Sequence, residues 1–355
     1  MSAQPDFVVP TGDYLNEWMQ DTEIIAAELG RRLGVTRKHV SELLSGKAPL
    51  SRNMAISLEE VTRIPARIWN QYEALYREDL ARLEANAAFA KQHEAAKLYP
   101  LAYLRKFGHI RAAGSDKAGT VRQLLSIFGV ASLDALATTW AKGSVAYRRT
   151  VAGREDAPAL ETWLTLGERA AEHIDLAEFD GRALKSMLPD LRSLSDSDPT
   201  TYVADCINSL SRVGVALCLV PPMPGLGVYG ATRWLNGRPI VQLSLRYKTD
   251  DQLWFTLFHE IGHILLHGEN GLYLAGDGST AEEEADCFAA DLLIPKEFAE
   301  RLPRRRDIAA VQDLAAELGI APGIVLGRAQ REMGDFAWGN DLKKRFEFVS
   351  MEGSK

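Results

Sequence analysis

Five consecutive residues in the C-terminal half of the chain have the types and spacing of a metal site. The chain reads His259-Glu260-Ile261-Gly262-His263, which is the pattern H-E-x-x-H. Two histidines four residues apart on a helix project from one face, about 6 Å apart along the axis, so both imidazoles can reach one zinc ion. Glu260 lies about 100° around the helix, where it can reach the water that the zinc activates instead of the metal. The motif therefore predicts a zinc-dependent hydrolase with Glu260 as its general base.

The segment around this motif has the pattern of an amphipathic helix. Thr249 and Gln252 fit a capping box at its start, and Gly268 is a natural stop. Apolar residues recur at helical spacing between these limits: Trp254, Leu257, Phe258, Ile261, Ile264 and Leu265. The two histidines lie opposite this apolar stripe. We therefore expect the helix to bury its apolar side and to turn both histidines toward a cleft.

A tetrahedral catalytic zinc needs a third protein ligand, and a second predicted helix supplies candidates. Ser279, Thr280 and Glu282 fit a capping box at its start, and the helix ends near Pro295. On a helical wheel Glu282 and Glu284 both lie near the apolar face, so this pattern leaves the choice between them open. An acidic first turn is also favoured by the helix dipole without any metal.

Other residues are expected to support the motif. His267 lies one more turn along the first helix, and a straight helix does not easily bring three successive turns onto one ion. We therefore expect His267 to support the site or the helix end rather than to bind the metal. A hydrolase also needs a donor for the developing oxyanion, and the sequence does not choose among three candidates. These are Tyr229, Tyr247 and Tyr273.

Three runs within residues 200–340 resemble the ImmA/IrrE family of gluzincin-type metallo-endopeptidases. The runs are FHEIGHILLHG, EEEADCFAADLLIP and LAAELGIAPGIVLGRAQ. The resemblance implies that Glu284 is the third zinc ligand beside His259 and His263. Members of this family cut helix-turn-helix repressors and thereby switch on phage, mobile-element or DNA-damage genes. The resemblance thus implies a repressor-type protein substrate.

A second motif, near the N-terminus, has the spacing of a helix-turn-helix. Apolar periodicity predicts a helix over 26–33 that stops at Gly34, and Thr36 can cap a second helix that continues through Ser45. The small Gly30 permits the two helices to cross closely. The alternative is an ordinary helical hairpin with a solvated basic face.

The charge of this helix pair fits DNA. Residues 31–52 carry six basic side chains and one Glu, whereas residues 1–30 carry six acidic side chains and neither Lys nor Arg. The start of the second helix is expected to expose groups that suit phosphates and guanine edges in the major groove. The predicted DNA-binding residues are Thr36, Arg37, Lys38 and Ser41. One such helix reads few bases, so we expect a homodimer on a palindromic double-stranded operator.

Residues 12–76 resemble the HigA-like branch of the Cro/cI (XRE) repressors. The matching runs are GDYLNEWM, LGRRLGVTRKHVSELLSGKAPLS and IPARIWNQYEALY. The resemblance implies a DNA-binding regulator and leaves room for a toxin partner. Ile25-Ala26 stand where that family usually has Ser-Gln, so one phosphate contact is missing here.

Between the two motifs the chain is rich in helical pattern, and a small sheet precedes the zinc helix. Residues 213–220 and 238–245 read as strands, and Asn236-Gly237 is a strong two-residue hairpin signal. We predict that this sheet is antiparallel. The strand over 238–245 is a candidate for aligning an extended substrate by strand addition.

The chain has 355 residues, which suggests two or three domains. We predict a multidomain, mainly helical protein with an α+β C-terminal part. Its predicted parts are a helix-turn-helix bundle (1–78), a helical middle domain (79–198), a zincin-like domain (199–300) and a helical extension (301–355).

Composition narrows the class of protein. A content of 46% hydrophobic and 25% charged residues excludes wholesale disorder. No apolar run approaches ~18 residues, and no signal sequence is visible, so we expect neither a membrane span nor secretion. Three cysteines without paired spacing fit a reducing cytoplasm. A net charge of −7 argues against nonspecific nucleic-acid binding by the chain as a whole.

Together these patterns predict a cytoplasmic transcriptional regulator that carries a zinc metallo-endopeptidase. It would cleave a repressor-type protein, or itself, to derepress stress, phage or mobile-element genes. The alternative is a HigA-type antitoxin or repressor whose zinc domain is structural or senses a ligand. A neighbouring toxin gene, or no proteolysis in the presence of zinc, would favour that alternative.

Overall fold

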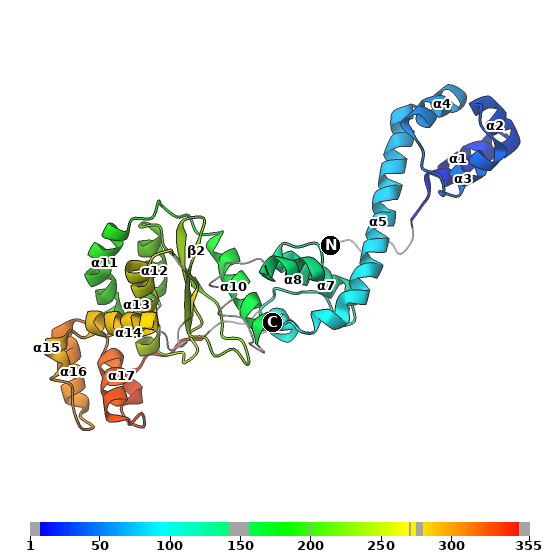
Figure 1. The fold of residues 1–355 in the computed structure, drawn as a ribbon. Coiled ribbons are helices and arrows are strands. Elements are labelled where there is room, and N and C mark those ends of the chain that lie inside the picture. The colour runs from blue at the N-terminus through cyan, green and yellow to red at the C-terminus, as the bar shows by residue number, and fades with distance from the viewer. Residues whose placement is uncertain (1–7, 142–155, 199, 270, 275–279, 348–355) are drawn as a thin grey trace. The chain divides into compact units, whose positions relative to one another are not determined.

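The computed structural model describes residues 8–141, 156–198, 200–269, 271–274 and 280–347. The chain divides into two compact units, Met1–His93 with Ser115–Gly119 and Glu94–Gly114 with Thr120–Lys355. The predicted domain boundaries at residues 78, 198 and 300 stay predictions. Most of the described chain is helical, as predicted, and the one described sheet lies in the second unit (Figure 1).

The N-terminal unit is a bundle of short helices. They are α1 (Thr11–Asp21), α2 (Ala26–Leu33), α3 (Arg37–Leu44), α4 (Arg52–Thr62) and the start of α5 (Ala66–Ala96). Leu29, Val40, Leu58 and Trp69 lie in its buried core. The bounds of α2 and α3 agree with the sequence prediction to within one residue.

The second unit holds the remaining elements. Its helices and short 3-10 turns are α6 (Leu101–Lys106), most of α7 (Lys117–Phe128), α8 (Leu133–Ala141), α10 (Ala157–Ala171), α11 (Gly181–Ser193), η1 (Leu194–Asp196), α12 (Tyr202–Ser211), α13 (Asp250–His267), α14 (Thr280–Leu293), α15 (Lys296–Ala299), α16 (Ile308–Leu318), α17 (Pro322–Met333) and η2 (Asn340–Leu342). Its strands are β1 (Ala216–Leu219), β2 (Gly230–Leu235), β3 (Arg238–Leu243) and β4 (Tyr273–Leu274).

The sheet has the strand order β1-β3-β2-β4 and is mixed. The hairpin between β2 and β3 is confirmed, because Asn236 (φ 52°) and Gly237 (φ 75°) have the positive φ angles that a two-residue type I′ turn requires. However, β1 pairs parallel to β3, so the predicted all-antiparallel sheet is wrong. Strand β2 of the hairpin pairs with one edge of β3, and β1 pairs with the other edge. Since both edges of β3 are already paired, β3 is not available for strand addition, contrary to the sequence prediction.

The sheet is covered by helices on both faces (Figure 1). Side chains alternate between the two faces along a strand. Ala216 and Cys218 of β1 therefore pack toward the α10 side, in a cluster with Ala171. Leu217, between them, joins the larger core that contains Phe258 of α13. This core also includes leucines of α11, so it crosses residue 198. The helix that carries the H-E-x-x-H motif, α13, thus contributes to the buried core of the unit.

Polar contacts fix the start of α13. The predicted capping box is not formed, because the side chain of Thr249 caps no amide. Instead the buried Asp250 carboxylate accepts hydrogen bonds from the amides of Asp251 (3.0 Å) and Lys344 (3.1 Å). The Lys343 ammonium lies 2.7 Å from Asp251. These contacts join the C-terminal segment to the helix that carries the motif.

Replacing Asp250 should make the domain more stable at neutral pH. Burial, together with the neighbouring Asp251, raises the pKa of Asp250 to about 6. The folded state therefore holds this proton more tightly than the unfolded chain, and this group's contribution to stability is lost as pH rises from about 4 to 6. Asp250→Asn keeps an oxygen for both amides, so unfolding at pH 7 should cost up to about 3 kcal/mol more. Denaturant titrations at pH 4.5, 5.5 and 7, with the exposed Asp205→Asn as control, would measure this.

One described segment, Lys117–Thr139, is long and apolar enough to cross a membrane by length and composition alone. This is weak evidence for a membrane span, because the segment consists of α7 and α8 with a break between them at Gly129 (φ 64°). Neither helix alone approaches the ~20 residues that a span needs.

Candidate metal centre and cleft

Three side chains from α13 and α14 converge on one point. The Nε2 atoms of His259 and His263 lie 3.1 Å apart. The Glu282 carboxylate lies 3.3 Å from Nε2 of His259 and 2.9 Å from Nε2 of His263. All three side chains are buried, and their possible ligand atoms lie within 4.8 Å of one another. The H-E-x-x-H spacing therefore brings both imidazoles to one buried point.

The donor set fits a divalent metal. Donors about 2.0–2.1 Å from a tetrahedral zinc lie roughly 3.3 Å from one another, and the three separations here are close to that value. A neutral imidazole carries one proton, so two Nε2 atoms that face each other and a carboxylate in a buried site make poor mutual hydrogen bonds. A cation between them would satisfy all three. The described residues can thus hold a metal without rearrangement.

The structure brings Glu282, and not Glu284, to the two histidines. Residues two apart on a helix point in nearly opposite directions, and here the Glu282 side chain is 8% exposed whereas that of Glu284 is 60% exposed. Gly262 lets α14 approach α13 closely, since a Cβ there would lie 3.3 Å from Cα of Ala285. Glu284, the ligand that the resemblance implied, instead lies 2.9 Å from His267. Glu282 therefore replaces Glu284 in our candidate ligand set.

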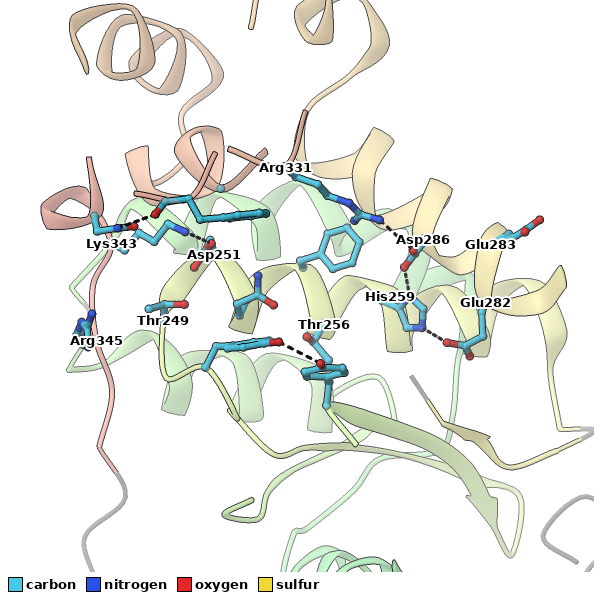
Figure 2. A pocket seen from close by; sticks show the side chains of 17 residues that line it. Thr249, Asp251, Thr256, His259, Glu282, Glu283, Asp286, Arg331, Lys343 and Arg345 are labelled. Atoms are coloured by element: carbon cyan, nitrogen blue, oxygen red, sulfur yellow. Dashed lines mark hydrogen bonds and ion pairs between the residues drawn. The ribbon is translucent and has the colours of Figure 1, made fainter. Parts of the chain in front are cut away.

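Asp286 is a site residue that the sequence analysis missed. Its Oδ1 lies 2.9 Å from Nδ1 of His259, on the ring edge away from the candidate metal (Figure 2). A carboxylate in this place fixes the tautomer that leaves Nε2 free to bind metal. The available signal was spacing, because Glu282 and Asp286 are one helical turn apart and share a face. Arg331 of α17 lies 3.7 Å from the second oxygen of Asp286.

Glu260 is fully buried between α13 and β2. Its Oε2 accepts a 2.6 Å hydrogen bond from the hydroxyl of Thr232. Its Oε1 has no hydrogen-bond partner among the described residues. Gly230 provides the space, since a Cβ at that position would lie 2.3 Å from Oε1. One carboxylate oxygen is thus held by the sheet while the other is available to accept a proton.

The electrostatics of the centre follow from burial and close charges. Burial raises the pKa of Glu260 to about 8, although His259 and Thr232 act in the opposite direction. Burial alone would lower the pKa of His259, but the carboxylates of Asp286 and Glu282 raise it to about 10. The pKa of His263 is lowered, chiefly by burial. A cation held by these ligands would favour neutral imidazoles and an ionised Glu260, which is the state that a general base needs.

A cleft of about 920 Å³ runs from this centre along α13 (Figure 2). His259, Glu282 and Asp286 line one end, and the C-terminal segment with Lys343 and Arg345 lines the other. Two of the three candidate oxyanion donors, Tyr229 and Tyr247, also line it, with their hydroxyls 3.1 Å apart. The third, Tyr273, stacks its ring on His263, with centroids 4.4 Å apart.

Residues 212–330 match the family model of the IrrE N-terminal-like domain, Peptidase_M78. This part of the chain is similar to a metallopeptidase-type regulatory domain. The match includes all of the candidate centre: both histidines, Glu260, Glu282 and Asp286. Peptidase_M78 proteins are generally metal-dependent, which agrees with the donor set described above. A search of the curated proteins found no match to the chain.

The predicted DNA-binding residues lie outside the Peptidase_M78 match. In the described structure Thr36, Arg37, Lys38 and Ser41 are all exposed at the start of α3. The Thr36 hydroxyl accepts a hydrogen bond from the amide of His39 (3.2 Å), so it caps the helix. A nucleic-acid interface at α3 stays a prediction.

Proposed function

We propose that the chain is a zinc-dependent endopeptidase that regulates transcription by cleaving a helix-turn-helix repressor, or itself. The observation that carries this proposal is the convergence of His259, His263 and Glu282 beside a buried Glu260, at the end of a cleft. A purely structural zinc is normally closed by four protein ligands, whereas the three candidate ligands among the described residues would leave a position for water and substrate.

In the proposed reaction, water adds to a peptide carbonyl and the peptide C–N bond breaks. A bound zinc ion would lower the pKa of water and polarise the carbonyl. Glu260 accepts the proton of the attacking water at its available Oε1 and then gives it to the leaving amine. Thr232 holds the other oxygen of Glu260, and Asp286 keeps His259 in the metal-binding tautomer. Tyr229 and Tyr247 remain candidates for hydrogen bonding to the oxyanion.

The cleft and β4 suggest how a substrate would lie. β4 is an edge strand of the described sheet, and its Tyr273 stacks on His263. An extended peptide that adds to β4 would therefore pass directly beside the centre. The neighbouring cleft can take the side chains that follow. This placement replaces the strand over 238–245 as the proposed guide for the substrate.

Cleavage of a protein substrate is the test. The zinc-loaded chain is incubated with candidate helix-turn-helix repressors and, separately, alone, and the products are identified by mass spectrometry. A single new pair of termini that forms only with zinc supports the proposal. Intact proteins in every mixture, with zinc bound, would support instead an antitoxin-like regulator whose zinc domain is structural or sensory.

We also propose that α2 and α3 bind a DNA operator as part of a homodimer in the cytoplasm. The support is local. A Cβ on Gly30 would lie 2.9 Å from the carbonyl oxygen of Val35, so this crossing needs a glycine. Gly34 ends α2 with φ 71°, and the exposed start of α3 carries Arg37 and Lys38. These features suit a recognition helix that enters the major groove.

Replacing Arg37 and Lys38 with Ala should weaken operator binding. A lost base contact costs on the order of 1–3 kcal/mol, and a lost phosphate contact costs less and lowers the salt dependence. Selection from randomised DNA followed by titration at several salt concentrations would measure both effects, with the exposed Lys296→Ala as control. If selection enriches no sequence, α3 is structural or contacts a protein.

A further inference from the structure

We infer that His267 and Glu284 form a hydrogen-bonded chain that positions His263 for metal binding. The inference rests on the proposed metal site and assigns a role to two neighbouring residues, His267 and Glu284, that lie outside the candidate donor set. His267 Nδ1 lies 3.0 Å from His263 Nδ1, and His267 Nε2 lies 2.9 Å from a Glu284 carboxylate oxygen. These hydrogen bonds therefore run from Glu284 through the imidazoles of His267 and His263 to the candidate metal centre.

The protons along this chain can be placed in only one consistent way when His263 binds metal. Nε2 of His263 faces the centre, so it must carry a lone pair and the ring proton must sit on Nδ1. That N–H then donates to Nδ1 of His267. A neutral His267 that accepts at Nδ1 carries its own proton on Nε2, where it donates to Glu284. Each donor meets one acceptor, and the hydrogen bonds therefore select the His263 tautomer that metal binding needs.

The two candidate metal-binding histidines are thus held by different means. His259 donates its outer N–H directly to a carboxylate, Asp286, at 2.9 Å. His263 reaches its carboxylate only through a second imidazole. The reason lies in the helix, because the residue one turn beyond His263 on the same face is His267. This arrangement also explains why Glu284 lies close to the centre without entering it.

Stacking restrains the same rings. The Tyr273 ring lies nearly parallel to His263, with 11° between the planes, and its centroid is 5.4 Å from that of His267. The His267 side chain is 13% exposed, whereas that of Glu284 is 60% exposed. Water can therefore take over part of the Glu284 hydrogen bond but has little access to His267. We expect His267 to contribute more to positioning than Glu284 does.

The test measures zinc affinity of the full chain by competition with a chelator. His267→Phe keeps an aromatic ring beside Tyr273 but removes the acceptor, and loss of such a supporting bond typically lowers metal affinity about 10–100-fold. His267→Asn places an amide oxygen near the position of Nδ1, so it should recover most of the affinity. Glu284→Gln should cost less than about tenfold. Asp291→Asn, an exposed carboxylate on the same helix, is the matched control and should change nothing.

A second readout reports the His263 proton directly. In the zinc-loaded chain with 15N-labelled histidine, NMR should detect a hydrogen-bonded Nδ1–H proton from each of His259 and His263, in addition to that of His173, which donates to the carbonyl of Arg169. His267→Phe should remove or shift only the His263 signal. Circular dichroism checks folding, and if His267→Phe misfolds, Glu284→Gln carries the comparison. Wild-type affinity together with an unchanged His263 signal in His267→Phe, or in Glu284→Gln if His267→Phe misfolds, would overturn the inference. Absence of zinc binding by the wild type would instead contradict the proposed metal site itself.

Discussion

Glu260→Gln should abolish most peptide cleavage while leaving the metal in place. The substitution nearly preserves size, and its amide oxygen can still accept the hydrogen bond from Thr232. It removes the group that takes the proton of the attacking water, and loss of a positioned general base costs about 10²–10⁴ in rate. Initial rates on an identified repressor substrate, measured with saturating zinc, would give this factor.

Metal content separates this effect from loss of the site. Zinc per chain and melting temperature should stay close to wild type in Glu260→Gln, because Glu260 is not a ligand. His259→Ala should lose both zinc and cleavage. If Glu260→Gln cleaves at the wild-type rate, the assignment of the general base is wrong. If instead Glu260→Gln loses cleavage but leaves derepression in cells unchanged, while His259→Ala prevents derepression, the zinc domain acts as a sensory or structural module.

Local patterns predicted much of the structure. The bounds of α2, α3 and α13, and the Asn236-Gly237 hairpin, follow from capping residues, apolar spacing and turn chemistry, which act over a few residues. The parallel pairing of β1 with β3 could not be predicted from local patterns, because no turn connects these two strands. β1 pairs with the edge of β3 that the β2–β3 hairpin leaves unpaired. The start of α13 lies where the pattern predicted it, but its contacts differ: Lys344, far along the chain, accepts a hydrogen bond from the Asp250 amide and donates one to the Asp250 carboxylate.

The candidate site likewise contains residues that local spacing could place and residues that depend on packing between elements. The two histidines and Glu260 lie on one helix, so their spacing alone placed them. The candidate third ligand belongs to another helix, and its identity depends on how α14 is rotated against α13. Close packing at Gly262 sets this rotation and turns Glu282 and Asp286 inward together. Thr232 and Gly230 come from β2, and no local pattern connects them to Glu260.

The choice of carboxylate leads to the second large effect. Glu282→Ala should lower zinc affinity by at least about 100-fold, since a site worth 10–16 kcal/mol in binding divides into roughly 3 kcal/mol for each ligand. Glu284→Ala should cost less than about tenfold, because it removes only a partly exposed bond to His267. Chelator competition on both variants would rank them, and the reverse order would restore Glu284 as the ligand.

Thermal unfolding provides an independent check of the same ranking. A ligand that binds only the folded state stabilises it by about 2.7 kcal/mol at 100 times its dissociation constant. Zinc should therefore raise the melting temperature of the wild type and of Glu284→Ala, but it should have little effect on Glu282→Ala at the same concentration. This difference is expected because Glu282 is buried beside His263, whereas Glu284 lies outside the donor set. If zinc raises the melting temperature of both variants as much as that of the wild type, neither carboxylate is a ligand.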